Sequence, residues 1–213
     1  PAWFAPPQPD WPAGLQLTGF PLEDAGGGAP LPTAVARFLD AGAPPVAFTT
    51  GTANATSHAF FAEAVRACAL SGRRGLLLTP HAAQLPAHLP PGVAHAAYVP
   101  FGALLPRLAA LVHHGGIGTT AQALRAGVPQ LLRPMAFDQF DNARHVLRLG
   151  TGRQLLPRRW RAPAVARALD GLLDDAALRQ RCAAVAQALA AEPPGAEAAA
   201  DALESLAARA WPA

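Results

Sequence analysis

The sequence predicts an α/β fold in which a doubly wound parallel sheet of about six strands carries helices on both faces. Two observations predict this class. Short, continuous apolar runs alternate with longer segments of helical periodicity, which is typical of parallel strands buried on both faces. In addition, hydrophobic residues make up 51% of the 213 residues and charged residues only 15%. The chain is therefore long and apolar enough to bury a substantial core.

The apolar runs define the expected strands in order along the chain. Each run follows a turn and ends near glycine, proline or polar residues, the punctuation expected around buried strands. The expected strands span residues 44–50, 75–79, 93–99, 108–114, 129–133 and 152–156. With helices between successive strands, this arrangement is Rossmann-like.

The segments between the strands have helical patterns, and several of them end at a glycine, a common helix C-cap. The expected helices span residues 31–42, 57–70, a short turn at 101–107, a helix that ends at Gly127, and 140–150. From about residue 162 the chain is rich in alanine and is broken at residues 193–195. We expect this tail to form three helices laid against the sheet.

Residues 1–30 differ in composition from the rest of the chain. They are rich in proline and glycine, a composition that is typical of linkers and loops. We therefore expect an interdomain linker or hinge at 1–30, followed by one domain at 31–213. Trp3, Phe4 and Trp11 are too apolar for a free linker, so we expect them to pack against the domain or against a neighbour.

The basic residues exclude several chemistries. All 17 are arginine, so the chain has no lysine for a P-loop, a Schiff base or a kinase phosphate site. The net charge is only +3. The densest arginine cluster, Arg158, Arg159 and Arg161, is not a basic stripe, and we expect no nucleic-acid partner.

The start of the sequence, its apolar runs and its cysteines predict the cellular location of the protein. Residues 1–14 lack the features of a signal peptide, and no apolar run reaches the ~20 residues of a membrane span. Cys68 and Cys182 lie in helix-like segments and are expected to be small buried residues of a reducing compartment. We therefore expect a cytoplasmic protein without a membrane span.

The segment after the fourth expected strand carries the strongest functional signal. Residues 112–120 read VHHGGIGTT, so a strand ends in two imidazoles and three glycines precede a helix. Free N–H groups and the positive end of the helix dipole would meet there, which favours an anion. His114 adds a hydrogen-bond donor that can carry positive charge. We predict a phosphate site here, with Thr52 closing it from the first strand.

Three alternatives accompany this interpretation. The glycines could serve only tight packing between strand and helix. A zinc site through His113 and His114 is disfavoured because adjacent strand residues point in opposite directions, so we expect no metal and interpret His113 as a core or supporting residue. The pattern G-x-G-x-x-A from Gly116, with Asp138 ~20 residues later, would allow an NAD(P) fingerprint. That fingerprint normally follows a first strand, whereas this one follows the fourth.

The stretch from Tyr98 to Asn142 resembles the donor-binding signature of the UDP-glycosyltransferase family, which are two-domain enzymes of GT-B architecture. It is most similar to bacterial members of the macrolide, sterol, flavonoid and rhamnolipid type. The resemblance rests on the segments AFTTGTAN, YVPFGALLPR, VHHGGIGTT and LRAGVPQLLRPMAFDQFDNA. The fold it implies is the Rossmann-like half of a GT-B enzyme.

The resemblance implies a role for each residue that matches the family pattern. A first group is expected to hold the diphosphate of the donor, with His114 stabilising the leaving group: Thr52, His114, Gly116, Ile117, Gly118 and Thr119. A second group is expected at the base and ribose: Tyr98, Val99 and Gln122. A third group is expected at the sugar, namely Asp138 and Gln139, although Asp138 is also placed to act as an ordinary helix N-cap.

The resemblance also implies a reaction. The chain would be the nucleotide-sugar-binding half of a transferase that moves a hexosyl group from a UDP- or dTDP-sugar to a small hydrophobic acceptor. The transfer would invert the anomeric centre and need no metal or cofactor. The general base and the acceptor pocket are expected in an N-terminal domain, so this half alone would be inactive. An NAD(P)-binding oxidoreductase module and a non-catalytic nucleotide-sugar-binding subunit remain the alternatives.

Overall fold

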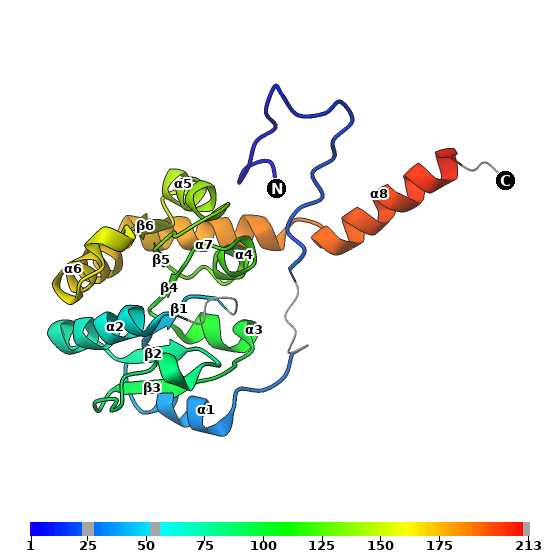
Figure 1. Ribbon diagram of the computed structural model, residues 1–213. Helices are drawn as coiled ribbons and strands as arrows, with labels where there is room; N and C mark the ends of the chain where they lie inside the picture. Colours follow the sequence, from blue (N-terminus) through cyan, green and yellow to red (C-terminus); the bar gives the residue numbers. More distant parts are fainter. Residues whose placement is uncertain (23–27, 52–55, 211–213) are drawn as a thin grey trace.

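The computed structural model describes residues 1–22, 28–51 and 56–210. Six parallel strands form a single sheet in the order β3-β2-β1-β4-β5-β6 (Figure 1). The strands are β1 Val46–Thr49, β2 Gly75–Leu78, β3 Val93–Ala96, β4 Ala110–His113, β5 Gln130–Leu132 and β6 Gly152–Gln154. The predicted fold class and each of the six predicted strands are confirmed.

The third strand is shorter than predicted. The apolar run was expected to pair as far as Val99, but β3 ends at Ala96. β3 is an edge strand, and Ala96 pairs with Leu78, the last residue of its only neighbour, β2. Beyond this point the chain has no partner strand to extend the ladder, so Tyr98 and Val99 leave the sheet.

Helices cover both faces of the sheet, as the sequence predicts. One face carries α2 and α6, and the opposite face carries α1, α3 and α4 (Figure 1). The helices are α1 Thr33–Asp40, α2 His58–Ser71, α3 Phe101–Leu104, α4 Ile117–Arg125, α5 Gln139–Leu149, α6 Ala162–Leu173, α7 Ala176–Ala190 and α8 Gly195–Ala210, with short 3₁₀ turns at Ala82–Gln84, Leu105–Arg107 and Pro157–Arg159. Among the described residues, no helix combines the length and hydropathy that a membrane crossing requires.

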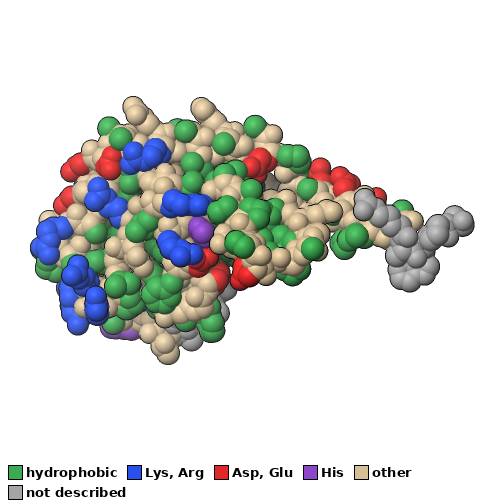
Figure 2. Space-filling model, turned by 90° about the horizontal axis from the view of Figure 1, so that it is seen from above, with side chains coloured by type: hydrophobic (Ala, Val, Ile, Leu, Met, Phe, Trp, Pro, Cys, Tyr) green, Lys and Arg blue, Asp and Glu red, His purple; other side chains and the backbone are tan. Residues whose placement is uncertain are grey.

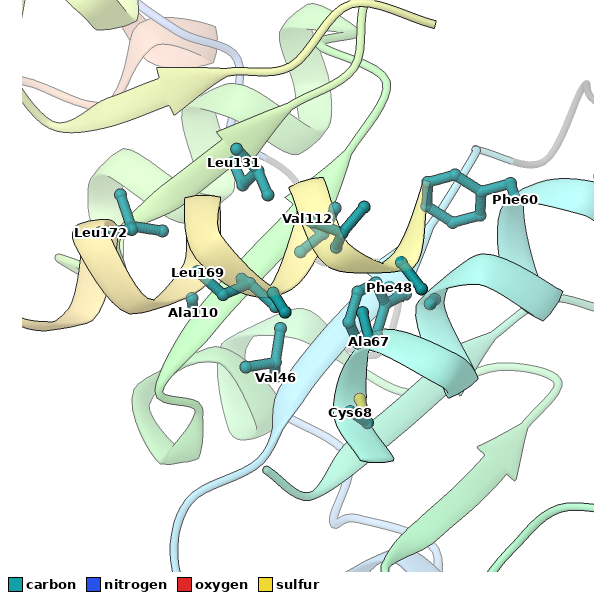
Figure 3. Packing of buried hydrophobic residues seen from close by; sticks show 14 of the residues in the cluster. Val46, Phe48, Phe60, Ala67, Cys68, Ala110, Val112, Leu131, Leu169 and Leu172 are labelled. Atoms are coloured by element: carbon teal, nitrogen blue, oxygen red, sulfur yellow. The ribbon is translucent and has the colours of Figure 1, made fainter. Parts of the chain in front are cut away.

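The core between the sheet and the helices α2 and α6 is apolar and closely packed. Side chains of β1 and β4, among them Phe48 and Val112, point toward Leu169 of α6 (Figure 3). All three are fully buried. Phe60 of α2 stacks on Trp160 with ring centroids 4.7 Å apart. This cluster holds β1 and β4 side by side, and the loops that follow these two strands are anchored by it.

Both cysteines lie within the packed interior. Cys68 and Cys182 are buried and form no disulfide. Burial raises the pKa of the Cys68 thiol to about 12 and that of Cys182 to about 11. Both therefore behave as the small buried residues that the sequence predicts.

The N-terminal segment packs onto the domain. Phe4 and Phe20 are buried in a cluster with residues of α4, α5 and α7. The Trp3 indole donates a hydrogen bond to Glu192, and Arg148 donates to the carbonyl oxygens of Trp3 and Phe4. The predicted packing of Trp3 and Phe4 is confirmed, whereas the hinge role of residues 1–30 stays a prediction.

The C-terminal tail forms three helices with the predicted break, but its last helix does not lie against the sheet. Figure 1 shows α8 projecting away from the domain. Leu203 and Leu206 on this helix are 67% and 54% exposed. Because most side chains of α8 are alanine, the helix has little apolar area to gain by packing. The prediction that all three helices cover the sheet is therefore wrong for α8.

The contrast between the buried Leu169 and the exposed Leu203 gives a stability prediction. Leu169→Ala should lower the free energy of unfolding by about 2–5 kcal/mol, because the fully buried side chain leaves a cavity between α6 and the sheet. Leu203→Ala is the matched control and should change it by less than about 0.5 kcal/mol. Urea unfolding followed by circular dichroism measures both. Equal losses in the two variants would contradict the assigned core.

Candidate functional site

The strand order reverses between β1 and β4. The connection after β1 runs through α2 on one face of the sheet, and the connection after β4 runs through α4 on the other. Ligands of open parallel sheets bind at such a switch point, outside the carboxyl ends of the strands. A cavity of about 950 Å³ opens at this switch point. Its size lies in the range of small-molecule and cofactor sites.

The cavity gathers most of the residues that the sequence singles out. Loops after β1, β3, β4 and β5 all contribute to its wall. The predicted residues on the wall are Tyr98, Val99, His114, Gly116, Ile117, Gly118, Thr119, Gln122 and Gln139. Asp138 is exposed and does not line the cavity. Thr52 lies outside the described residues.

The imidazole of His114 is clamped between two glycines. A Cβ atom added to Gly51 would lie 2.8 Å from Cε1 of the His114 ring, and one added to Gly116 would overlap Nε2. Gly51 also has a φ of +80°, which residues with a Cβ rarely adopt. The ring therefore occupies space that a side chain at either glycine would need, and a larger residue at either position would displace it.

The same clamp determines the electrostatics of His114. Burial lowers the pKa of the imidazole, and the nearby Asp138 carboxylate partly opposes this effect. The ring is therefore neutral at pH 7 in the free protein. Its Nδ1 atom is buried and has no hydrogen-bond partner in the described part of the chain. A buried ring nitrogen without a partner is costly, and the residue that carries it lines the cavity.

The first turn of α4 points unpaired donors at the cavity. Gly116 is the N-cap of this helix, so the N–H groups of Ile117, Gly118 and Thr119 have no acceptor within the helix. The Thr120 side chain and N–H both bond back to the Gly116 carbonyl at 3.0 Å, which fixes the turn. The positive end of the helix dipole reinforces these donors. The arrangement is suited to an anion.

His113 is a core residue, as the sequence predicts. It is fully buried, and burial lowers its pKa to about 3. Its Nδ1 accepts a hydrogen bond from the Gly115 N–H at 3.1 Å, so Nε2 carries the proton and donates to Oε1 of Gln130 at 2.9 Å. Both nitrogens are used within the protein, which leaves none for the zinc alternative.

Asn142 was missed as a functional residue, although it lies inside the motif. Its amide nitrogen donates to the Gly115 carbonyl at 2.9 Å and to the Asp138 carboxylate at 2.7 Å. Gly115 has a φ of +93°, and a Cβ there would lie 3.0 Å from the Gln139 carbonyl oxygen. Asn142 therefore fastens the loop after β4 to the start of α5. Its spacing, one helical turn after Asp138, is compatible with the bond to Asp138 but gives no signal for the bond to Gly115.

The loop before α5 is organised by Gln139. Its Oε1 accepts hydrogen bonds from the N–H groups of Met135 and Ala136 at 2.9 and 3.2 Å, so only the amide nitrogen is left to face a ligand. Phe137 has a φ of +55° and is 91% exposed on the rim of the cavity. Asp138 occupies the N-cap position of α5, but its side chain makes no capping bond.

The far end of the cavity is formed by residues around β3 and α4. Tyr98 is 59% exposed there, while Val99 and the Gln122 side chain are buried. An exposed aromatic ring beside buried polar and apolar groups offers a surface on which a planar group can stack. These are the residues that the resemblance to the UDP-glycosyltransferases assigns to the base and ribose, an assignment that stays a prediction.

Two further parts of the wall were not predicted. Residues 20–22 line the cavity although the sequence places them in a linker, and the signal for them was a phenylalanine and a leucine among prolines. Thr50 also lines it, directly after β1. The rule that ligands sit at the carboxyl ends of strands indicates this position as clearly as it indicates Thr52.

The clamp around His114 leads to a paired prediction. Gly116→Ala should lower the free energy of unfolding by about 1–3 kcal/mol because its Cβ overlaps the ring. Gly118→Ala, where a Cβ meets nothing within 4 Å, should be neutral or raise it by up to about 1 kcal/mol as helix propensity improves. Urea unfolding measures both, and NMR of the imidazole carbons should report a shift for His114 only in the first variant. A Gly116→Ala protein as stable as the wild type would refute the clamp.

The comparisons with known proteins point to one group of enzymes. At the level of sequence, the chain is 37% identical over 191 residues to O-mycaminosyltylonolide 6-deoxyallosyltransferase of Streptomyces fradiae, covering 87% of this chain and 44% of that protein. It is 38% identical over 152 residues to vancomycin aglycone glucosyltransferase of Amycolatopsis orientalis, covering 70% and 36%.

Solved structures agree. The calicheamicin glycosyltransferase CalG4 superimposes with a TM-score of 0.69 at 27% identity, covering 80% of this chain and 43% of that one. The glycosyltransferase SnogD from Streptomyces nogalater superimposes with a TM-score of 0.63 at 33% identity, covering 78% and 44%. The chain thus spans less than half the length of these relatives.

The family described as erythromycin biosynthesis protein CIII-like, C-terminal domain, matches residues 76–206. This match contains His114, the turn between β4 and α4 and the loop before α5, and the Rossmann-like sheet agrees with the C-terminal domains of GT-B glycosyltransferases. The chain therefore belongs to the erythromycin biosynthesis protein CIII-like C-terminal domain family, within the UDP-glycosyltransferases.

Proposed function

We propose that this chain binds the nucleotide-sugar donor of a glycosyltransferase that moves a hexosyl group from a UDP- or dTDP-sugar to a small hydrophobic acceptor. The single observation that supports it best is the switch-point cavity, in which the N-terminus of α4 and the clamped His114 face the same space. The relatives named above transfer sugars to complex natural products, which supports the substrate class. In this proposal the general base and most of the acceptor pocket are formed by residues outside this chain.

The proposed placement of the donor follows from the chemistry of the wall. The diphosphate lies against the N–H groups of Ile117, Gly118 and Thr119, and Gly116 has no side chain to obstruct it. His114 donates a further hydrogen bond. The base and ribose extend toward Tyr98, Val99 and Gln122. Asp138 and Gln139 stand on the sugar side, with the Gln139 amide nitrogen as the group still able to reach a hydroxyl.

The proposed reaction is a direct displacement at the anomeric carbon that inverts its configuration, without a metal or other cofactor. As the bond from the sugar to the diphosphate breaks, negative charge grows on the leaving phosphate. The donors of α4 and His114 are already oriented toward that charge, so they stabilise the transition state without reorganising. Removal of one such oriented donor typically costs about 2.7–4 kcal/mol of barrier.

The proposal predicts a specific loss on removal of the imidazole. His114→Ala should weaken UDP binding about 10- to 100-fold, because a hydrogen bond to a charged group contributes about 1.5–3 kcal/mol. Calorimetric titration with UDP, dTDP and their hexose conjugates measures it. His145→Ala is the matched control, since His145 pairs with Asp141 and does not line the cavity. Binding of NADH in place of every nucleotide sugar would favour the oxidoreductase alternative and end this proposal.

The lowered pKa of His114 gives a second prediction. The free imidazole is neutral at pH 7, and a bound diphosphate beside it favours the protonated form, so binding takes up a proton. UDP-glucose affinity should therefore rise as the pH falls from 8 to 6, by at most about tenfold per pH unit. It should level off below the pKa that His114 has in the free protein. UDP-glucose is the suitable probe because its diphosphate does not titrate in this range. His114→Gln should bind with an affinity that is independent of pH, and a sloping profile in that variant would assign the proton elsewhere.

A further inference from the structure

Thr50 is a buried polar residue for which the fold supplies no partner. It is 4% exposed and follows β1 directly, and its hydroxyl oxygen makes no hydrogen bond within the described part of the chain. The other buried threonines are all bonded through their side chains: Thr49 to the Gly51 N–H, Thr79 to Gln84 and the His81 N–H, Thr120 to the Gly116 carbonyl and Thr151 to the Val146 carbonyl. A buried hydroxyl without a partner costs folding free energy, so Thr50 is the exception among the buried threonines of the described residues.

Its position shows what could complete its bonding. Phe48 of β1 pairs with Val112 of β4, and Thr50 and His114 each follow two residues later at the ends of these neighbouring strands. A Cβ atom added to Gly51, the next residue, would lie 2.8 Å from Cε1 of the His114 ring. The buried Nδ1 of that ring also lacks a partner. Two unpartnered polar side chains therefore lie next to each other at the switch point, and both line the same cavity.

The chemistry of this place favours an oxygen of an anionic ligand. The N-terminus of α4 borders the same cavity and adds its unpaired N–H groups. No arginine, aspartate or glutamate lines the cavity among the described residues. A hydroxyl is both donor and acceptor, and beside a helix N-terminus its donor function is the one that a phosphate oxygen uses.

We propose that Thr50 is a ligand-binding residue, whose hydroxyl donates a hydrogen bond to a diphosphate oxygen between β1 and the His114 ring. The inference rests on the proposed donor site. It adds Thr50 to the residues that are proposed to bind the diphosphate. Thr50 would act on the diphosphate and not on the base. Its hydroxyl thus reduces the stability of the empty fold and increases the affinity for the donor.

The test uses an exchange that keeps the shape and removes the hydroxyl. Thr50→Val should raise the dissociation constant for UDP about tenfold, leave the weak affinity for uridine unchanged, and keep or raise Tm. Thr50→Ser should bind UDP within twofold of the wild type, because it restores the donor. Thr151→Val is the matched control, since Thr151 is equally buried but bonds to a backbone carbonyl. It should leave UDP binding unchanged and should not raise Tm.

The outcomes separate this inference from the proposed function. If the wild type binds UDP and Thr50→Val binds it equally well, Thr50 does not touch the donor, while the proposed function stands. An equal loss for uridine and UDP would place the contact away from the diphosphate and overturn the assignment. A lower Tm in Thr50→Val would mean that the hydroxyl has a partner within the fold, which also overturns it. If the wild type binds no UDP, the proposed function and this inference both fail.

Discussion

The connections that leave β1 and β4 run to opposite faces of the sheet, and this reversal determines everything at the site. It opens the carboxyl ends of two adjacent strands, so that the loops after them meet without a helix packed between them. One loop brings Thr50 and Gly51, and the other brings His114 and the start of α4. The buried cluster of α2 and α6 holds the two strands in register beneath these loops. The hydrophobic core therefore determines where the two strand ends lie, and hydrogen bonds of Thr120, Gln139 and Asn142 then fix the loops at the site.

The proposed diphosphate site would hold its anion without a permanently charged side chain. The chain has no lysine, and no arginine lines the cavity among the described residues. Figure 2 shows arginine and acidic side chains interspersed over one face of the molecule, with no continuous basic stripe. In the proposed complex, the favourable charge in the cavity comes instead from backbone N–H groups and from an imidazole that is neutral in the free protein and gains a proton when the anion binds. Such a site is selective, because its donors are fixed in direction and contribute little attraction at long range.

The sequence predicts the sheet, the two faces of helices and most of the cavity wall, because those depend on apolar periodicity and on the carboxyl ends of strands. It does not predict which hydrogen bonds the side chains inside the motif make. Gln139 uses its carbonyl oxygen to hold its own loop, and Asn142 joins Gly115 to Asp138, and neither pairing follows from spacing alone. Helical propensity also predicts α8 correctly as a helix but does not indicate what it packs against. Thr50 was missed because a threonine at a strand end is ordinary β-propensity until its unpartnered hydroxyl is seen.

The two unpartnered groups at the switch point, Thr50 Oγ1 and His114 Nδ1, fit the view that binding sites lower the stability of the empty fold. Their neighbours show that the fold could have done otherwise. His113, the residue before His114, satisfies both ring nitrogens, and Thr49, the residue before Thr50, satisfies its hydroxyl. On each strand the earlier residue has its side-chain hydrogen bonds within the protein, and the next one has a side-chain atom without a partner, although Thr49 lines the cavity as Thr50 does. What separates the supporting residues from the ones left available to a ligand is therefore whether the fold satisfies their polar atoms, not which of them borders the cavity.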